Sequence, residues 1–197
     1  MPKTVAVDGG VVDGSTKDCL KRLADLAEFE LSEAPNAKDP ACKIKNPVRL
    51  KSILAGNPIR LPGNPVLDCP FALDFARWTI ERANALSNQH LNARIKSVLT
   101  GPGFVCRRRN NLPTGKLSEH AFGNAIDIAS LELDNGIRFP IKQHEEEPAK
   151  SFQRALRTAS CDHFSTVLGP GSNPAHDFHF HFDQSRGGNK ATYRLCE

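Results

Sequence analysis

The sequence predicts an α+β domain in which helices flank a core of antiparallel β-sheet. Three observations lead to this fold class. Apolar residues recur at helical spacing in residues 70–91. Short segments with strand-like patterns follow one another in the second half of the chain. Asp134-Asn135-Gly136 is a strong hairpin signal between two of them. Strands joined by hairpins pair antiparallel, so the helical segments are expected to cover the resulting sheet.

Residues 1–16 are rich in Gly and Val without periodicity, and we expect them to form a flexible N-terminal arm. Residues 17–197 are expected to form a single domain, because 197 residues are close to the length of one domain. The apolar fraction of 39% is ordinary for a folded protein and excludes a disordered chain. No run approaches the roughly 18 consecutive apolar residues of a membrane-spanning helix, so no membrane span is predicted.

Three segments have the pattern of helices. Residues 16–31 repeat leucine at helical spacing, and Ser15 or Thr16 can cap their first turn. Residues 70–91 start with Pro70, which suits the first turn of a helix, and residues 147–161 are the third segment. The apolar stripe of the second helix consists of Ala72, Phe75, Ala76, Ile80 and Ala83.

Strands are predicted for six segments. Pro47 limits the first of them to the edge of a sheet, because proline cannot donate a ladder hydrogen bond. The turn at residues 101–103, Gly-Pro-Gly, separates the second segment from the third. The six segments are residues 44–54, 95–99, 104–107, 124–133, 137–141 and 177–183.

The charge balance argues against a nucleic acid as the partner. The chain has 26 Lys and Arg residues and 22 Asp and Glu residues, a net charge of +4. Basic residues cluster only at Arg107, Arg108 and Arg109, with Lys116 nearby, whereas a nucleic-acid-binding protein usually has a broader basic face. A polyanionic polymer such as a cell wall is compatible with this charge.

The six cysteines predict three disulfides and an oxidising compartment, because they are even in number and widely spaced. No CxxC pair is present, which argues against a cysteine zinc site. We therefore expect a periplasmic or secreted protein. The first residues show no export signal, so either the signal has been removed or export uses another route, such as a contractile injection system. Six cysteines allow 15 connectivities, and the sequence alone does not choose among them. Of these we predict sequential pairing, Cys19–Cys42, Cys69–Cys106 and Cys161–Cys196, and the alternative is six buried free thiols.

Two short segments hold the candidate metal-ligating and catalytic residues. In the second segment, residues 176–183 (HDFHFHFD), strand alternation sends three phenylalanines into the core and places His179, His181 and Asp183 together on the other face. Neutral imidazole is the commonest metal ligand near neutral pH. Two histidines and an aspartate make a plausible catalytic zinc set, which keeps one position open for water. The three phenylalanines are Phe178, Phe180 and Phe182.

The first segment, residues 118–127 (SEHAFGNAID), supplies the remaining donors. His120 is expected at the end of a loop, and Gly123 permits a turn before the strand that holds Asp127. Ala125 shares the face of Asp127 and is small, which leaves room above a metal.

The pattern SxHxxGxAxD followed by HxH resembles the metallopeptidase superfamily of lysostaphin, the D-Ala-D-Ala metallopeptidases and the hedgehog signalling domain. The chain is still more similar to the extensin-like C-terminal family of Gram-negative bacteria, over residues 42–183. The matching segments are CKIKNPVRL, LDCPFALDFARW, CRRRN, LSEHAFGNAIDIA and FSTVLGPGSNPAHDFHFHFD.

The superfamily resemblance implies a zinc metallopeptidase domain with ligands His120, Asp127 and His181. It also implies that His179 acts as general base or stabilises the transition state. His176 matches a further active-site histidine of the penicillin-insensitive murein endopeptidases, which share the HxxHxH spacing. The D-Ala-D-Ala dipeptidases have Glu three positions before the last ligand, where this chain has Phe178, so the endopeptidase branch fits better.

Two further residues are expected to contact substrate. Superfamily members often have an arginine at the end of a strand before the first ligand, and Arg107 is in that position, where it would bind a substrate carbonyl or carboxylate. The alternative for Arg107 is a solvated surface cation. Ser118 is expected to hydrogen-bond a ligand or the substrate, and its alternative is a turn cap.

The expected activity is that of a zinc-dependent murein endopeptidase that hydrolyses D-Ala–diaminopimelate cross-links in peptidoglycan. One alternative is a DD- or LD-carboxypeptidase acting on wall peptide stems. Another is a non-catalytic wall-binding module stabilised by zinc. In a variant of the first hypothesis the protein is an antibacterial effector, and its partners then include an immunity protein.

Overall fold

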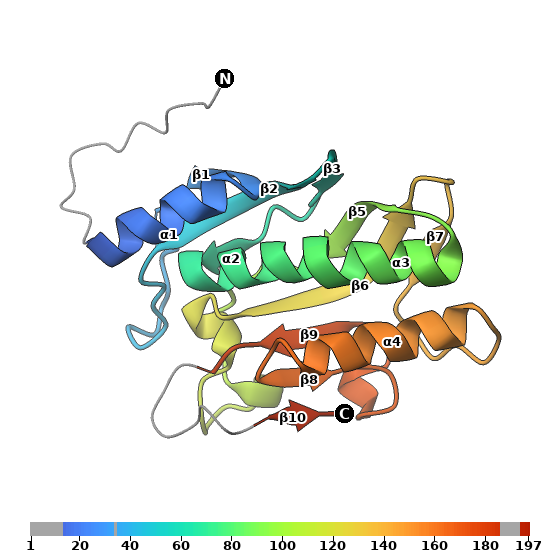
Figure 1. Ribbon diagram of the computed structural model, residues 1–197. Coiled ribbons are helices and arrows are strands. Elements are labelled where there is room, and N and C mark those ends of the chain that lie inside the picture. The colour runs from blue at the N-terminus through green and yellow to red at the C-terminus, as the bar shows by residue number, and fades with distance from the viewer. Residues whose placement is uncertain (1–13, 34, 186–193) are drawn as a thin grey trace.

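The computed structural model describes residues 14–33, 35–185 and 194–197 (Figure 1). The helices are α1 (Gly14–Ala24), α2 (Cys69–Trp78), the π-helix η1 (Thr79–Ala83), α3 (Asn84–Leu91), the 3-10 helices η2 (Arg109–Asn111) and η3 (Glu119–Phe122), α4 (Ala149–Cys161) and the 3-10 helix η4 (Pro174–His176). The strands are β1 (Ala27–Leu31), β2 (Pro47–Ala55), β3 (Asn57–Arg60), β4 (Val66–Asp68), β5 (Ile95–Thr100), β6 (Ala125–Leu133), β7 (Arg138–Pro140), β8 (Thr166–Leu168), β9 (Phe180–Asp183) and β10 (Leu195–Cys196).

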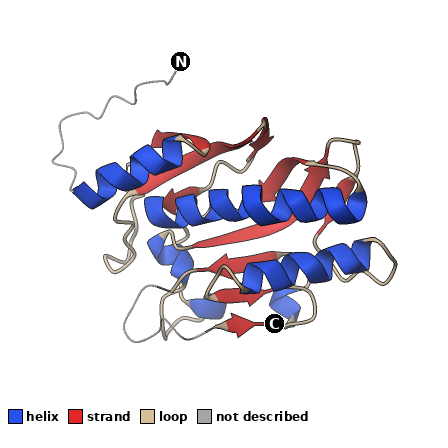
Figure 2. Ribbon diagram, viewed as in Figure 1, coloured by secondary structure: helices blue, strands red, loops and turns tan. Residues whose placement is uncertain are grey.

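The strands of the described ranges form one sheet in the order β1-β2-β3-β5-β6-β9-β8-β10, with β4 paired to β2 and β7 paired to β6. The β3–β5 and β8–β10 pairs are parallel, and the others are antiparallel. Figure 2 shows α2, α3 and α4 lying across one face of the sheet. The predicted fold class, a mainly antiparallel sheet flanked by helices, is therefore confirmed.

The core lies between these helices and the central strands. Trp78 of α2 packs edge-on against Phe182 of β9, with ring centroids 5.0 Å apart, and Phe164 stacks on Phe182 at 4.9 Å. Ile126 and Ile128 of β6 are buried in the same core cluster. Each large aromatic ring removes much apolar surface from water, so this cluster holds β6 and β9 firmly against α2.

Several predicted elements agree closely with the structure. The predicted helix over residues 70–91 is the continuous run α2–η1–α3, interrupted by one π-helical turn. Residues 95–99 and 124–133 correspond to β5 and β6. The hairpin at residues 134–136 leads into β7 as predicted, and the expected helix over 147–161 is α4.

Two predicted elements are wrong in type. The helix expected over residues 16–31 ends at Ala24, and residues 27–31 form β1 instead, paired antiparallel with β2. The sequence of β1, Ala-Glu-Phe-Glu-Leu, alternates apolar and acidic residues, which suits a strand. Residues 104–107 are not a strand, because Phe104 and Val105 donate single backbone hydrogen bonds to Val66 and His120 and join no ladder.

The last predicted strand is shorter than residues 177–183, because residues 174–176 form η4 and β9 begins only at Phe180. The side chain of Phe178 is therefore exposed, at 74%, and the prediction that it packs in the core is wrong. Phe180 and Phe182 are buried as predicted.

The disulfides confirm one predicted pair, Cys161–Cys196, and correct two. The observed pairs are Cys19–Cys69 and Cys42–Cys106, not Cys19–Cys42 and Cys69–Cys106. Sequential pairing assumes that each bridge closes a neighbouring loop. Instead α1 packs on α2, which brings Cys19 to the start of α2 and leaves Cys42 for the segment before Arg107. Three disulfides are consistent with an extracellular or periplasmic protein.

The predicted N-terminal arm, residues 1–16, lies outside the described residues except for Gly14–Thr16, which begin α1. Within the described ranges, the helices lack the length and apolar character needed to cross a membrane.

Candidate metal centre

Two of the predicted ligands face each other across the β6–β9 pair. Asp127 and His181 are direct partners in the antiparallel register, and the neighbouring pair is Ile126 with Phe182. Because strand side chains alternate, the burial of Ile126 and Phe182 against the helices sends Asp127 and His181 to the opposite face. The predicted alternation along both strands is confirmed at these positions.

The third predicted ligand, His120, lies in η3, directly before β6. The Ser118 side chain caps this short helix by accepting a hydrogen bond from the His120 backbone N–H at 3.4 Å. Gly123 ends it with φ of 66°, and a Cβ there would lie 2.7 Å from the Asp68 backbone nitrogen. The glycine is therefore required for the turn that brings His120 back over β6.

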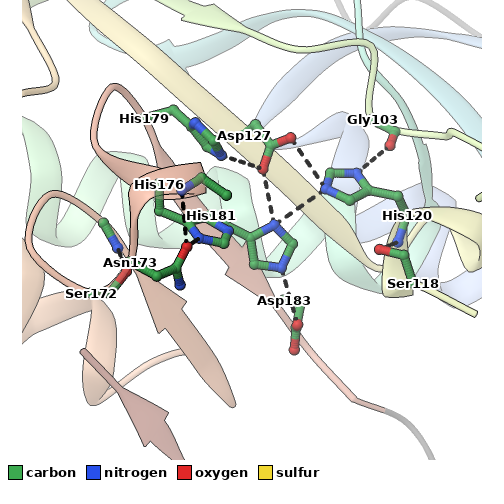
Figure 3. Close-up of polar contacts among 12 residues, drawn as sticks. Gly103, Ser118, His120, Asp127, Ser172, Asn173, His176, His179, His181 and Asp183 are labelled. Carbon is green, nitrogen blue, oxygen red and sulfur yellow. Dashed lines mark hydrogen bonds and ion pairs between the residues drawn. The ribbon is translucent and has the colours of Figure 1, made fainter. Parts of the chain in front are cut away.

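The structure brings His120, Asp127 and His181 together, and Figure 3 shows their donor atoms converging. His181 Nδ1 lies 2.9 Å from Asp127 Oδ1 and 3.2 Å from His120 Nε2. His120 Nε2 lies 3.3 Å from Asp127 Oδ2. These three side chains form a group that could hold a metal ion, each offering one ligand atom.

The hydrogen-bond partners of His120 and His181 on the side away from Asp127 determine which ring nitrogen of each is protonated and which presents a lone pair to the other two side chains. His120 Nδ1 lies 2.7 Å from the Gly103 carbonyl oxygen, which can only accept, so Nδ1 is the protonated nitrogen. His181 Nε2 lies 3.1 Å from Asp183 Oδ2, so Nε2–H donates to that carboxylate. In the neutral rings, His120 Nε2 and His181 Nδ1 then point lone pairs at each other and at the Asp127 carboxylate. Such an arrangement is repulsive without a cation between the three donors, and two imidazole nitrogens with a carboxylate oxygen are donor types that a metal ion such as zinc accepts.

The pKa shifts agree with a preference for positive charge at this place. Burial opposes ionisation of Asp127, yet hydrogen bonds with His120 and His181 hold the pKa of its carboxyl far below the usual range. Burial would lower the pKa of His181, but its hydrogen bonds with Asp127 and Asp183 raise that pKa to about 9. A proton on His181 supplies the positive charge in the metal-free site, and a divalent cation would replace that proton.

Two further histidines lie beside these three side chains. His179 Nε2 is 3.7 Å from Asp127 Oδ1, and the rings of His176 and His179 lie 5.0 Å apart. Burial lowers the pKa of both imidazoles, and neighbouring histidines lower it further, while the Asp127 carboxylate offsets part of the change. The pKa of His176 falls to about 4. Both rings are therefore neutral near pH 7 and can accept a proton.

Asn173 is a site residue that the sequence prediction missed. Its Oδ1 accepts from the Ala175 backbone N–H at 3.1 Å, which identifies this atom as the oxygen, and it lies 2.7 Å from His176 Nδ1. His176 Nδ1 must then be the donor, which leaves Nε2 of His176 as the basic nitrogen. The signal in the sequence is Asn173-Pro174, an N-cap followed by a proline at the first helical position.

Sequence alternation placed Asp183 with His179 and His181 in a plausible zinc set, but in the structure the converging donors are those of His120, Asp127 and His181, and Asp183 contacts the outer nitrogen of His181. It is 6% exposed and holds His181 through the hydrogen bond described above. Among the described residues, its second oxygen, Oδ1, is a buried acceptor without a hydrogen-bond partner. The carboxylate therefore fixes both the orientation and the tautomer of a candidate ligand, a role often seen in zinc proteins.

Arg107 and Ser118 line a pocket of about 580 Å³ together with His176 and His181. Arg107 is half-buried and follows an irregular segment rather than the predicted strand. Its positive charge contributes to lowering the pKa of His176 and His179, which places it within electrostatic reach of both rings. The hydroxyl of Ser118 forms the turn cap of η3, and its contact with substrate stays a prediction.

Comparison with known proteins gives a family but no described relative. The family model for the extensin-like protein C-terminus matches residues 17–197. No curated protein and no solved structure matches the chain. The match covers all but the first 16 residues and includes both candidate ligand segments, so the chain belongs to the extensin-like protein C-terminus family.

Proposed function

We propose that the protein is a zinc-dependent murein endopeptidase that hydrolyses D-Ala–diaminopimelate cross-links of peptidoglycan. The proposal includes membership of the metallopeptidase superfamily of lysostaphin and the D-Ala-D-Ala metallopeptidases. One observation carries it: three inward-facing donors, on His120, Asp127 and His181, converge beside two imidazoles that are neutral near pH 7.

The three donors would hold zinc through His120 Nε2, His181 Nδ1 and one carboxylate oxygen of Asp127. When bound, zinc supplies Lewis acidity that lowers the pKa of a water toward about 7 and polarises a carbonyl. Gly103 and Asp183 keep the two imidazoles in the tautomers that the site needs.

The remaining residues have distinct roles in the proposed hydrolysis. His179, whose Nε2 lies next to the Asp127 carboxylate, accepts the proton of the attacking water. His176, whose Nδ1 is held by Asn173, accepts the second proton of that water through Nε2. The two imidazoles then return both protons to the leaving nitrogen, which gives a carboxylate and an ammonium as products. Arg107 stabilises the negative charge that develops on the scissile carbonyl oxygen.

The presence of His176 and His179 favours hydrolysis over the wall-binding alternative. A structural zinc needs its ligands and their outer partners only. A base beside the metal adds nothing to such a site. Burial lowers the pKa of the His176 imidazole, and a histidine whose pKa is lowered in the folded state reduces the stability of the fold at acidic pH.

The proposal is tested by incubating the zinc-loaded protein with purified sacculi and analysing the soluble fragments by mass spectrometry. We expect cross-linked dimers to decrease and monomers to increase, and a chelator should block both changes. His179→Ala should abolish the reaction while retaining zinc, whereas His90→Ala, on α3, is the matched control and should remain active. Loss of terminal D-Ala from uncross-linked stems would instead identify a carboxypeptidase. Unchanged fragments from a protein that holds zinc tightly would favour the wall-binding module.

A further inference from the structure

The loop over residues 107–118 forms one wall of the pocket beside the candidate metal centre. Its two ends run antiparallel, because Ser118 N–H donates to the Arg107 carbonyl and Arg109 N–H donates to the Lys116 carbonyl, both at 3.0 Å. Arg108 and Leu117 form the bridge between these two pairs. The disulfide Cys42–Cys106 anchors the base of the loop.

This pairing sorts the basic side chains onto two faces. Residues opposite each other in an antiparallel pair share a face, and neighbours along each strand point to opposite faces. Arg107, Arg109 and Lys116 accordingly line the pocket together with Ser118. Arg108 points away, where its guanidinium donates to the Gly115 carbonyl and lies 3.5 Å from Asp39 Oδ2.

The face of the loop that lines the pocket carries three cations, Arg107, Arg109 and Lys116. Arg109 lies 3.8 Å from Glu119 Oε1 and is 54% exposed at its side chain, so this ion pair is weak and open to solvent. Within residues 14–33, 35–185 and 194–197, neither Arg107 nor Lys116 forms an ion pair with a carboxylate. Cations that face a pocket without a carboxylate of their own are suited to binding an anionic ligand.

We propose that this cationic wall binds the free carboxylates of an acidic peptide, with Arg107 nearest the reacting bond and Arg109 and Lys116 forming a second carboxylate subsite. The inference rests on the proposed function, and what it adds is the second subsite, Arg109 and Lys116. Arg107 lines the pocket together with His176 and His181, so a first carboxylate or carbonyl binds there. The arginine fork is suited to bidentate pairing with a carboxylate, and Lys116 adds a point charge beside it.

A small acid fits the pocket better than a phosphate polymer. Glu119, Asp183 and Glu197 also line it, and they would repel a densely charged polyanion. The net charge of +4 is low for a protein that binds a polyphosphate backbone. An acidic peptide presents a few carboxylates separated by neutral atoms, which matches cations on one wall only.

The test compares binding of the stem peptide L-Ala–γ-D-Glu–diaminopimelate in two forms, with free and with amidated carboxylates. Isothermal titration of the zinc-loaded protein measures both. We expect Arg109→Ala and Lys116→Ala each to weaken binding of the free acid about three- to fivefold, as for a partly exposed ion pair, and to reduce its salt dependence. The amidated peptide should be unaffected. Arg108→Ala removes the same charge on the other face and should change binding less than twofold.

Equal weakening by Arg108→Ala, or equal affinity for the two peptide forms, would overturn the inference. Competition by an oligonucleotide as effective as the free acid would overturn it too. Unfolding temperature and zinc content of each variant show that the fold is intact. Peptide binding is measured independently of hydrolysis. Charge-dependent binding by a protein that leaves sacculi intact would therefore support the proposed carboxylate subsite and refute only the proposed endopeptidase activity. Hydrolysis of sacculi together with charge-independent peptide binding would refute only the proposed carboxylate subsite.

Discussion

Removing the carboxylate of Asp183 should weaken zinc binding although Asp183 is not one of the proposed ligands. Asp183 Oδ2 accepts from His181 Nε2–H at 3.1 Å, and both side chains are at most 10% exposed. A charge-assisted hydrogen bond in a buried setting contributes about 1.5–3 kcal/mol, which corresponds to roughly 10- to 150-fold in affinity. Outer partners of zinc histidines typically change affinity by about 10- to 100-fold when removed. We therefore expect Asp183→Ala to weaken zinc binding about 100-fold.

Asp183→Asn separates the charge from the hydrogen bond. The amide oxygen can still accept from His181 Nε2–H, so this variant should weaken zinc binding only about tenfold, because neutral hydrogen bonds are about half as strong. The assay is competition with a chromophoric chelator at fixed pH. Asp25→Asn, an exposed carboxylate on the turn after α1, is the control and should leave the affinity unchanged. Wild-type zinc affinity in a folded Asp183→Ala protein would refute the tautomer argument.

Three further predictions address the other parts of the site. Asn173→Ala should lower kcat about tenfold with little change in KM or zinc content, because His176 loses its fixed tautomer; steady-state kinetics on a cross-linked peptide measure this, and an unchanged kcat contradicts it. Gly123→Ala should destabilise the fold by at least about 2 kcal/mol in denaturant unfolding, since its backbone has φ of 66° and a Cβ would contact Asp68; a smaller loss means that the turn tolerates a side chain. The metal-free protein should lose stability as pH rises from about 6.5 to about 9, because the folded pKa of His181 is raised and its proton is lost over that window; a flat unfolding temperature between these pH values contradicts this.

The central part of the fold could be predicted from local patterns, and the periphery could not. The stripe of residues 70–91 and the turn at residues 134–136 act through local chemistry, so α2–η1–α3 and the β6–β7 hairpin appear where predicted. β1 was missed because its apolar residues continue a helical spacing from α1, and its pairing with β2 decides its conformation. β8 and β10 are only three and two residues long, and their pairing with β9 and with each other depends on distant segments.

The candidate ligands Asp127 and His181 could be predicted because apolar and polar residues alternate along β6 and β9. The Ile126–Phe182 pair packs inward, so the Asp127–His181 pair must face outward. The residues that fix the tautomers could not be found this way. Gly103 contributes a carbonyl from 17 positions earlier in the chain, and such a contact has no side-chain signature. The same limit explains the two wrong disulfides, since tertiary packing of α1 on α2 selects the partner of Cys19.

The central claim is that His120, Asp127 and His181 together hold one zinc ion. The most direct measurement is the zinc content of purified, dialysed protein by mass spectrometry, for the wild type and for three single variants. We expect one zinc per wild-type chain and less than about a tenth of that in His120→Ala, Asp127→Ala and His181→Ala, since each removes one of the three protein ligands. His163→Ala, whose imidazole contacts the Asp74 carbonyl, is the control and should keep its zinc. A zinc-free wild type, or full zinc in any of the three ligand variants, would contradict the account.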